Sequence, residues 1–174
     1  MFEQIAGGSV GARIVVQTRL GRSIDNEIRP FTSHDRQRAD VQYHQYRIQF
    51  GNRWIQRKSA CGGYNCFGML FASRRTGIFE ASEVEKILHD DGYELLDDVR
   101  SVRTGDIVLY RLKPSGELAH GSRVVTVVPR KPVPDIWVLS KWNIGWGEDI
   151  HPIGEICMEN SVRHWEIWTE RNGS

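Results

Sequence analysis

The chain has 174 residues, of which 40% are hydrophobic and 26% are charged, and its formal net charge is +1. A chain of this length and composition is expected to form one folded domain, residues 1–174, and a disordered chain is excluded. The small net charge gives no reason to expect nucleic acid or an acidic membrane as a partner.

The sequence contains no run of 18 apolar residues, and its first residues lack the basic start and long apolar core of a signal peptide. We therefore expect no membrane contact and a cytoplasmic protein, with export of a trimmed form left open. The chain has 3 cysteines, an odd number that argues against a fully paired disulfide framework and fits a reducing compartment. Nothing in the sequence indicates an oligomeric state.

The first part of the chain is expected to contain two strands joined by a surface segment. Residues 1–12 are rich in glycine and are expected to be loose, whereas residues 12–20 have the β-branched content of a strand. Residues 21–40 are polar and without a sustained period, so we interpret them as an excursion over the surface. Apolar and polar residues alternate in residues 41–50, which predicts a half-buried strand.

The segment 61–73 combines a glycine turn, two cysteines and an apolar run. Asn65 is a residue type that caps helices, and a helix is predicted from Cys66 to residue 74 or 75. At a helix N-terminus the unpaired backbone N–H groups favour thiolate, which is the reactive form of cysteine. We therefore interpret Cys66 as a candidate nucleophile and Cys61 as a residue of the turn.

The rest of the chain predicts one more helix and then a sheet. Ser82 and Glu85 have the spacing of a capping box before an apolar stripe that ends at Gly92. The later segments are apolar and β-branched, and they predict strands at residues 106–112, 120–128 and 136–142, with the apolar tail residues Trp165, Ile167 and Trp168 closing or packing on the sheet. Helices in the first half and hairpin strands in the second predict an α+β fold with an antiparallel sheet.

A thiol nucleophile needs a base, and His120 is the best placed of the 6 histidines. It stands at the start of a predicted strand, where the strand period of two puts it on one face with Ser122 and Val124. We expect this face to meet the helix that starts at Cys66, so that the imidazole projects toward the thiol. The alternative is a histidine of a surface loop.

Two segments resemble the nucleophile and base motifs of the NlpC/P60 and CHAP cysteine hydrolases. Asn-Cys-Phe-Gly-Met-Leu at residues 65–70 resembles the Asp-Cys-Ser-Gly-Leu motif of these families. Gly-Asp-Ile-Val-Leu-Tyr at residues 105–110, followed by His120, resembles their Gly-Asp-Leu-Val-Phe-Phe and His-Val-Gly-Ile. The chain departs from the pattern at Phe67, where a small serine is typical, and in the Gly-Ser-Arg that follows the histidine. The resemblance covers roughly residues 60–145.

The resemblance implies a papain-like fold in which the helix with the cysteine packs on the antiparallel sheet. It implies that Cys66 attacks an amide, peptide or isopeptide bond of a peptide or protein-like substrate, with His120 acting as base and then as acid. A thiolate–imidazolium pair would form before substrate binds, and neither a metal nor an organic cofactor is needed. The oxyanion hole would use the Cys66 N–H and one further donor from the preceding polar residues.

In the resembling families a polar residue from the strand after the histidine orients the imidazole ring. Ser140, Asn143 and His151 are the candidates in this chain, and we favour His151. Lys141 is unsuitable for this role, because an ammonium group cannot accept the imidazole N–H.

Three other interpretations stay open. Cys61 and Cys66 could bind zinc together with His120, His151 or Cys157, although zinc sites usually space the first pair of cysteines more closely and repeat the pair. The chain could be a noncatalytic binding domain in which Cys66 is a small buried residue. It could also be a transglutaminase-like acyltransferase, which passes the acyl group to an amine instead of water.

Overall fold

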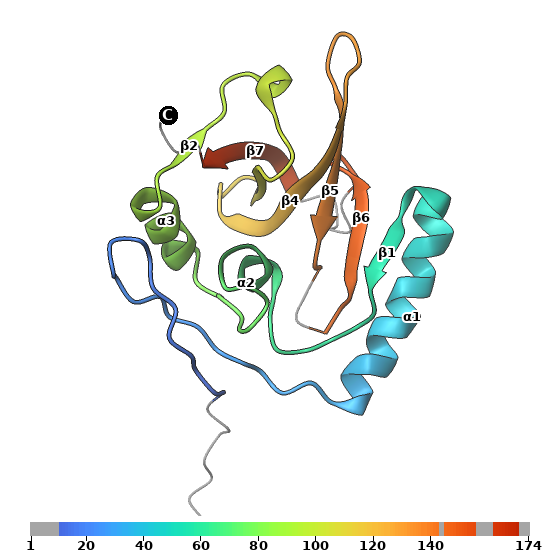
Figure 1. Cartoon of the computed structure of the whole chain (residues 1–174). Helices are drawn as coiled ribbons and strands as arrows, with labels where there is room; N and C mark the ends of the chain where they lie inside the picture. Colours follow the sequence, from blue (N-terminus) through green and yellow to red (C-terminus); the bar gives the residue numbers. More distant parts are fainter. Residues whose placement is uncertain (1–10, 143–144, 156–161, 171–174) are drawn as a thin grey trace, which may run out of the picture.

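The computed structural model describes residues 11–142, 145–155 and 162–170. These residues form a mixed α/β structure around one antiparallel sheet with the strand order β1-β6-β5-β4-β3-β7-β2 (Figure 1). The strands are β1 (Ile55–Lys58), β2 (Tyr93–Leu95), β3 (Ile107–Leu112), β4 (Leu118–Val128), β5 (Asp135–Ser140), β6 (Glu148–Pro152) and β7 (Val162–Glu170). The antiparallel sheet and the few helices confirm the predicted α+β class.

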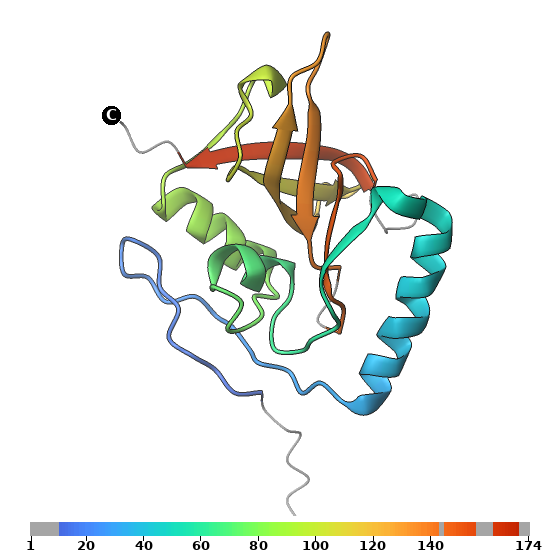
Figure 2. The ribbon, with the colours of Figure 1, turned by 45° about the vertical axis from the view of Figure 1, so that its right-hand side comes forward.

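The helices are α1 (Ser33–Phe50), α2 (Cys66–Phe71) and α3 (Ala81–Asp90). Figure 2 shows α2 and α3 together on one side of the sheet and α1 apart from them, next to β1. Because side chains alternate along a strand, the sheet has two apolar faces. Ile107 and Leu109 of β3 pack with α2 and α3, on what we call the helix face. Val108 and Tyr110 pack in a second core on the opposite face.

The prediction of a strand at residues 41–50 is wrong, because this segment is the second half of α1. The helix begins with a capping box, in which the Thr32 hydroxyl accepts the backbone N–H of Asp35 and the Asp35 carboxylate accepts the N–H of Thr32. This box satisfies two backbone donors that a helix start leaves unpaired. It lies inside the segment 21–40, which we expected to be a surface excursion without regular structure.

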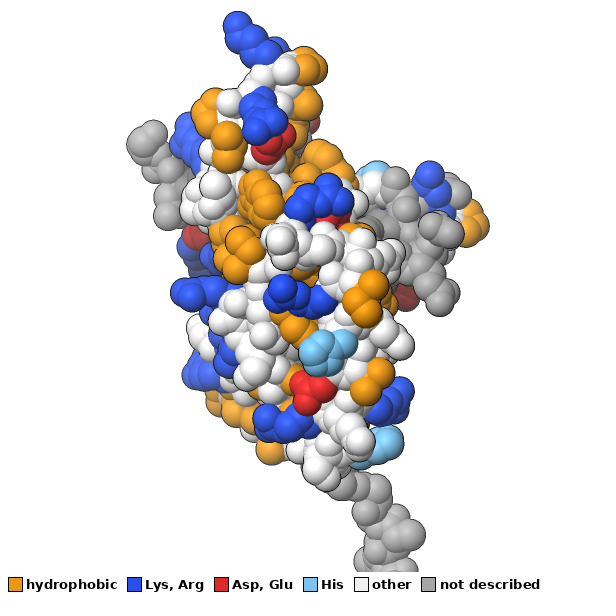
Figure 3. Space-filling view, turned by 90° about the vertical axis from the view of Figure 1, so that its right-hand side faces the viewer, with side chains coloured by type: hydrophobic (Ala, Val, Ile, Leu, Met, Phe, Trp, Pro, Cys, Tyr) orange, Lys and Arg blue, Asp and Glu red, His pale blue; other side chains and the backbone are white. Residues whose placement is uncertain are grey.

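The aromatic residues of α1 explain how the alternating pattern misled the sequence interpretation. Tyr46 and Phe50 are four residues apart, a spacing that fits one face of a helix as well as one face of a strand. In the structure both rings pack on tryptophans, with ring centroids 5.6 Å apart for Tyr46 and Trp146 and 4.8 Å apart for Phe50 and Trp54. The other side of α1 faces solvent, and Figure 3 shows charged side chains with interspersed hydrophobic ones on the face that carries it.

The strand predicted at residues 12–20 is also wrong. Among the described residues this segment makes only the isolated bridges Ala12 with Ile28 and Gln17 with Ser23. It is also held by a side chain, because the Thr18 hydroxyl donates to the carboxylate of Asp90 at 2.7 Å. No helix among the residues that the structure describes is both long and apolar enough to cross a membrane.

The second predicted helix and the later strands are confirmed, with small changes at the ends. α3 starts at Ala81, and its N-cap residue Glu80 makes no side-chain capping bond, so the proposed Ser82–Glu85 capping box is wrong. The predicted strands correspond to β3, β4 and β5, and the apolar tail forms β7 beside β3. These segments kept their predicted structure because their local patterns agree with the packing.

Candidate functional site

The start of α2 is fixed by the side chain of Asn65, which confirms the predicted cap. Its Oδ1 atom accepts the N–H of Gly68 at 2.9 Å and the N–H of Ile78 at 3.1 Å, while its Nδ2 group donates to the carbonyl of Ile78. One amide therefore caps the helix and pairs with the segment before α3 as a backbone group would. This arrangement fixes the position of Cys66, the next residue.

Replacing Asn65 by alanine is expected to lower the free energy of unfolding by roughly 2–4 kcal/mol, because the cap is lost and the Ile78 backbone loses both partners. Replacement by aspartate keeps the two acceptor bonds but sets a carboxylate oxygen against the Ile78 carbonyl in place of the donor, so it is expected to cost only part of this amount. Urea denaturation of the three proteins measures the difference. Equal stability of the wild type and the alanine variant would contradict this role of Asn65.

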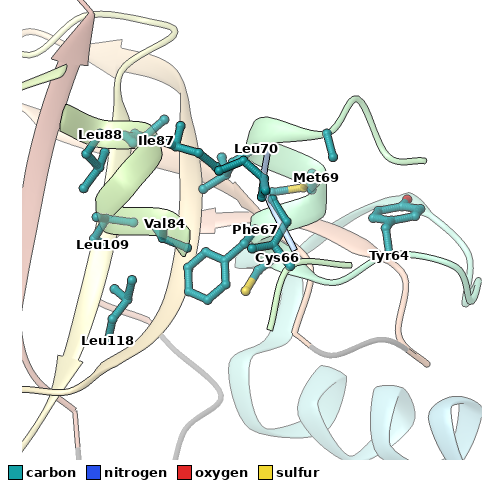
Figure 4. Packing of buried hydrophobic residues seen from close by; sticks show 14 of the residues in the cluster. Tyr64, Cys66, Phe67, Met69, Leu70, Val84, Ile87, Leu88, Leu109 and Leu118 are labelled. Carbon is teal, nitrogen blue, oxygen red and sulfur yellow. The ribbon is translucent and has the colours of Figure 1, made fainter. Parts of the chain in front are cut away.

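Cys66 is the first residue of α2, and its side chain lies in the core on the helix face (Figure 4). Backbone N–H groups of Gly121, Phe67 and Cys66 itself face the sulfur. Gly121 lies beneath the helix, since a Cβ atom there would come within 2.7 Å of the Leu70 side chain. The absence of a side chain at Gly121 therefore lets α2 approach β4 closely.

His120 is the residue before Gly121, and its side chain leaves β4 on the opposite face of the sheet. There its ring stacks on Trp142, with centroids 4.9 Å apart and planes 9° apart, and lies 5.6 Å from the ring of Tyr110. The expectation that the imidazole faces the helix is therefore wrong. The structure brings the Cys66 sulfur to the backbone beside His120, and among the described residues it gives no hydrogen bond between the thiol and the imidazole.

The charge states at these two residues also differ from the expectation. Burial raises the pKa of the Cys66 thiol to about 11, although the backbone N–H groups and Lys141 oppose this shift. Burial, together with the nearby His151, lowers the pKa of His120 to about 3. Both groups are therefore neutral at pH 7, and the thiolate–imidazolium pair is not formed in this conformation. Loss of hydration outweighs the effect of the helix terminus because the thiol is buried.

His151, the favoured third residue, lies on the same face as His120 but does not bind it. Its Nε2 atom is 2.7 Å from the Ser140 hydroxyl, and its Nδ1 atom is 2.8 Å from the carbonyl oxygen of Pro152. The Ser140 hydroxyl in turn bonds that of Ser122 at 2.5 Å. The Nε2 atom of His120 is buried and has no hydrogen-bond partner among the residues described. Asn143, the remaining candidate, lies outside the described residues.

A buried polar cluster on the helix face was missed by the sequence interpretation. We call it the Lys141 cluster, and it consists of Lys141, Cys61, Tyr64, Glu148 and Arg74. The Lys141 side chain is fully buried, and its ammonium group donates to the carbonyl oxygens of Cys61 at 2.8 Å and of Trp146 at 2.5 Å. The sequence did contain a signal, because a lysine stands inside an otherwise apolar strand pattern and is followed directly by tryptophan.

The acidic member of the Lys141 cluster is Glu148 on β6. It accepts the phenol of Tyr64 at 2.6 Å and a bidentate bond from Arg74, at 2.6 and 3.1 Å. Ser73 and Arg74 both have positive φ angles at the end of α2, of 50° and 64°, a strained conformation for residues other than glycine. The pair turns the chain back so that this arginine reaches Glu148, and both ends of α2 are thereby tied to the sheet.

Within the described residues, no group of three or more His, Cys, Asp and Glu side chains converges in a way that could hold a metal ion. The zinc interpretation included Cys157, which lies outside those residues. Burial raises the pKa of the Asp149 carboxyl to about 6, and its Oδ2 atom accepts the indole N–H of Trp146 at 2.9 Å. The partner of this carboxyl group is thus the indole of Trp146, which is not a metal ligand.

Searches for similar proteins among family models, curated proteins and solved structures found no match.

Proposed function

We propose that the chain is a papain-like cysteine hydrolase that cleaves an amide, peptide or isopeptide bond, with Cys66 as the nucleophile and His120 as the base and acid. The observation that supports this proposal is the backbone N–H of Gly121, the residue after His120, which lies near enough to the Cys66 sulfur to lower the pKa of the thiol. The two motifs, which are far apart in the sequence, thus meet at one end of β4. A cysteine at the start of a short helix that packs on an antiparallel sheet is the arrangement that a papain-like enzyme requires.

The chemistry follows from the charge states. Both groups are neutral at pH 7, so the imidazole of His120 takes the thiol proton while the sulfur attacks the carbonyl carbon, as in general-base catalysis. The resulting oxyanion needs donors that are already in place, and the N–H groups of Gly121, Phe67 and Cys66 lie near the sulfur. The same imidazole then protonates the leaving amine, and water releases the acyl group. Because the imidazole lies on the opposite face of the sheet, this route requires the backbone of β4 around His120 to rearrange, and a rotation of the side chain alone would not bring the ring to the thiol.

The alternative is a noncatalytic binding domain, and one observation favours it. The Cys66 side chain is only 7% exposed and its pKa is raised, which is the environment of an unreactive cysteine. The two proposals differ in what they expect of the thiol. A hydrolase needs a reactivity of Cys66 that depends on His120, whereas a packed cysteine does not.

Labelling with a peptide vinyl sulfone, read by mass spectrometry at each cysteine, tests the hydrolase proposal. We expect labelling of Cys66, and we expect the His120→Ala variant to label roughly a hundredfold more slowly because the general base is lost. His89→Ala is the matched control, since His89 has an 80% exposed side chain far from the site in the sequence. Circular dichroism confirms that each variant is folded. A Cys66 labelling rate that is the same in all three proteins would favour the binding domain.

A further inference from the structure

The Lys141 cluster lies between the turn that carries Cys66 and the segment that follows β5. The carbonyl of Trp146 accepts both the Lys141 ammonium group and the backbone N–H of Cys61, at 2.5 and 3.3 Å. The ammonium group also lies 4.5 Å from the centre of the Tyr64 ring, on which a cation is favoured. One side chain thus binds two chain segments that are about 85 residues apart.

Lys141 directly follows the last residue of β5, and its side chain lies on the same side of the sheet as α2. Ser140, the preceding residue, pairs with Ser122 on the face that carries His120, so the next side chain points to the helix face. Its positive charge also lowers the pKa of the Cys66 thiol, although this effect is smaller than that of burial and that of the backbone N–H groups. Lys141 therefore acts on the thiol through space and through the turn that holds it.

We propose that Lys141 is a positioning residue for Cys66, which holds the turn of residues 61–65 in place and supplies a positive charge that favours the thiolate. Its meaning for catalysis rests on the proposed hydrolase function, but its effect on the thiol does not. Cys66 is the residue that would touch substrate, and Lys141 acts on it without contacting the reacting atoms.

The charge of Lys141 depends on pH in an accessible range. Burial lowers its pKa to about 8, so the ammonium group is charged at pH 7 and loses its charge as the pH rises through about 8. The titratable and charged groups that face it come from the turn, from β6 and from the end of β1, and they are Cys61, Tyr64, Glu148 and Lys58. Glu148 keeps its negative charge throughout this range, because hydrogen bonds from Arg74 and Tyr64 outweigh burial and lower its pKa.

The test measures the rate of Cys66 alkylation by iodoacetamide from about pH 6.5 to 9.5, with the product assigned by mass spectrometry. We expect Lys141→Met to slow alkylation roughly threefold to tenfold at pH 7, since a nearby positive charge is lost. Above about pH 9 the two rates should converge, because the wild-type lysine is then neutral as well. Lys141→Arg keeps its charge at every pH, so its profile should lack the wild-type inflection near pH 8. A purely structural role would not produce this dependence on pH.

Lys58→Met is the matched control, because Lys58 bonds the Tyr64 hydroxyl at 3.2 Å and is exposed. We expect it to change the Cys66 rate less than about twofold. If Lys141→Met slows or speeds alkylation equally at all pH values, or leaves it unchanged, the proposed role is overturned. Should the methionine variant not fold, the missing inflection in Lys141→Arg decides the question.

The outcome is separable from that of the hydrolase test. A Cys66 labelling rate independent of His120, combined with the expected pH profile of the Lys141 variants, would overturn the hydrolase and leave the role of Lys141 intact. Labelling that depends on His120, combined with unchanged rates in the Lys141 variants, would support the hydrolase and overturn the role of Lys141.

Discussion

Replacing Gly68 by alanine is expected to lower the free energy of unfolding by roughly 3 kcal/mol or more. Alanine normally stabilises a helix interior relative to glycine by about 1 kcal/mol. Here a Cβ atom would lie 1.8 Å from the carbonyl oxygen of Thr76 and 3.1 Å from the Tyr64 side chain. The first contact is with backbone, so α2 would have to move away from the segment that follows it.

Urea denaturation measures this effect, and Gly154→Ala is the matched control. A Cβ atom at Gly154 would meet nothing within 4 Å, so this variant should remain within about 0.5 kcal/mol of the wild type. Because α2 carries Cys66, the Gly68 variant should also expose the thiol and speed its alkylation. A Gly68→Ala protein as stable as the wild type would show that α2 is not packed as described.

Lowering the pH from 8 to 5 is expected to reduce the free energy of unfolding by roughly 3 kcal/mol, which is the net effect of two buried histidines and one buried carboxyl. Burial lowers the pKa of His120 to about 3 and that of His151 to about 4, whereas an unfolded histidine has a pKa near 6.5. As the pH falls, the histidines of the unfolded chain are therefore protonated at a higher pH than those of the folded protein. The stabilisation from neutral imidazole is complete above about pH 6.5 and is lost as the pH falls toward 3 to 4. At pH 5 each ring contributes a loss of about 2 kcal/mol.

Asp149 opposes part of this loss. Burial raises its pKa to about 6, so the folded protein binds this proton more tightly than the unfolded chain does, and stability rises by about 1 kcal/mol between pH 8 and pH 5. The two histidines outweigh the single carboxyl, and the net effect is acid destabilisation. Unfolding in urea at a series of pH values from 5 to 8 measures it.

His120→Phe separates the contribution of one ring. Phenylalanine can occupy the stack between Tyr110 and Trp142 and removes the buried nitrogen that has no partner among the described residues. The variant should lose about 2 kcal/mol less than the wild type between pH 8 and 5, while His89→Ala should follow the wild-type curve. Parallel curves for the wild type and His120→Phe would mean that His120 is not the buried neutral base described here.

Local sequence patterns were sufficient to predict a helix or strand wherever the segment fitted only one of the two. Asn65 was identified as a cap because a side-chain amide before an apolar run satisfies the free N–H groups of a helix start. The three hairpin strands were identified because long β-branched segments leave no competing interpretation. The sequence pattern did not predict α1, because Tyr46 and Phe50 fit the period of a strand as well as that of a helix. In the structure these two rings pack on Trp146 and Trp54, and Trp146 is distant in the sequence.

The candidate site was only partly accessible from the sequence. The order of Cys66 and His120 indicated that the two residues belong together, and the structure does bring the sulfur to the backbone next to the histidine. The face of the strand was not predictable, because a shift of one residue exchanges the two faces. Glycine at position 121 places α2 on that residue's face, and His120 consequently lies on the other.

The sequence alone determined the α+β class, the helix that starts at Cys66 and the strand that starts near His120, because each depends on neighbouring residues. Only the tertiary structure decided the charge states and the partners. Burial on opposite faces makes the thiol and the imidazole neutral. Lys141, which the sequence suggested only as an unsuitable orienter, became the group that holds the cysteine turn. The physical reason is that hydration and charge–charge distance depend on which segments meet in space, and no local pattern records them.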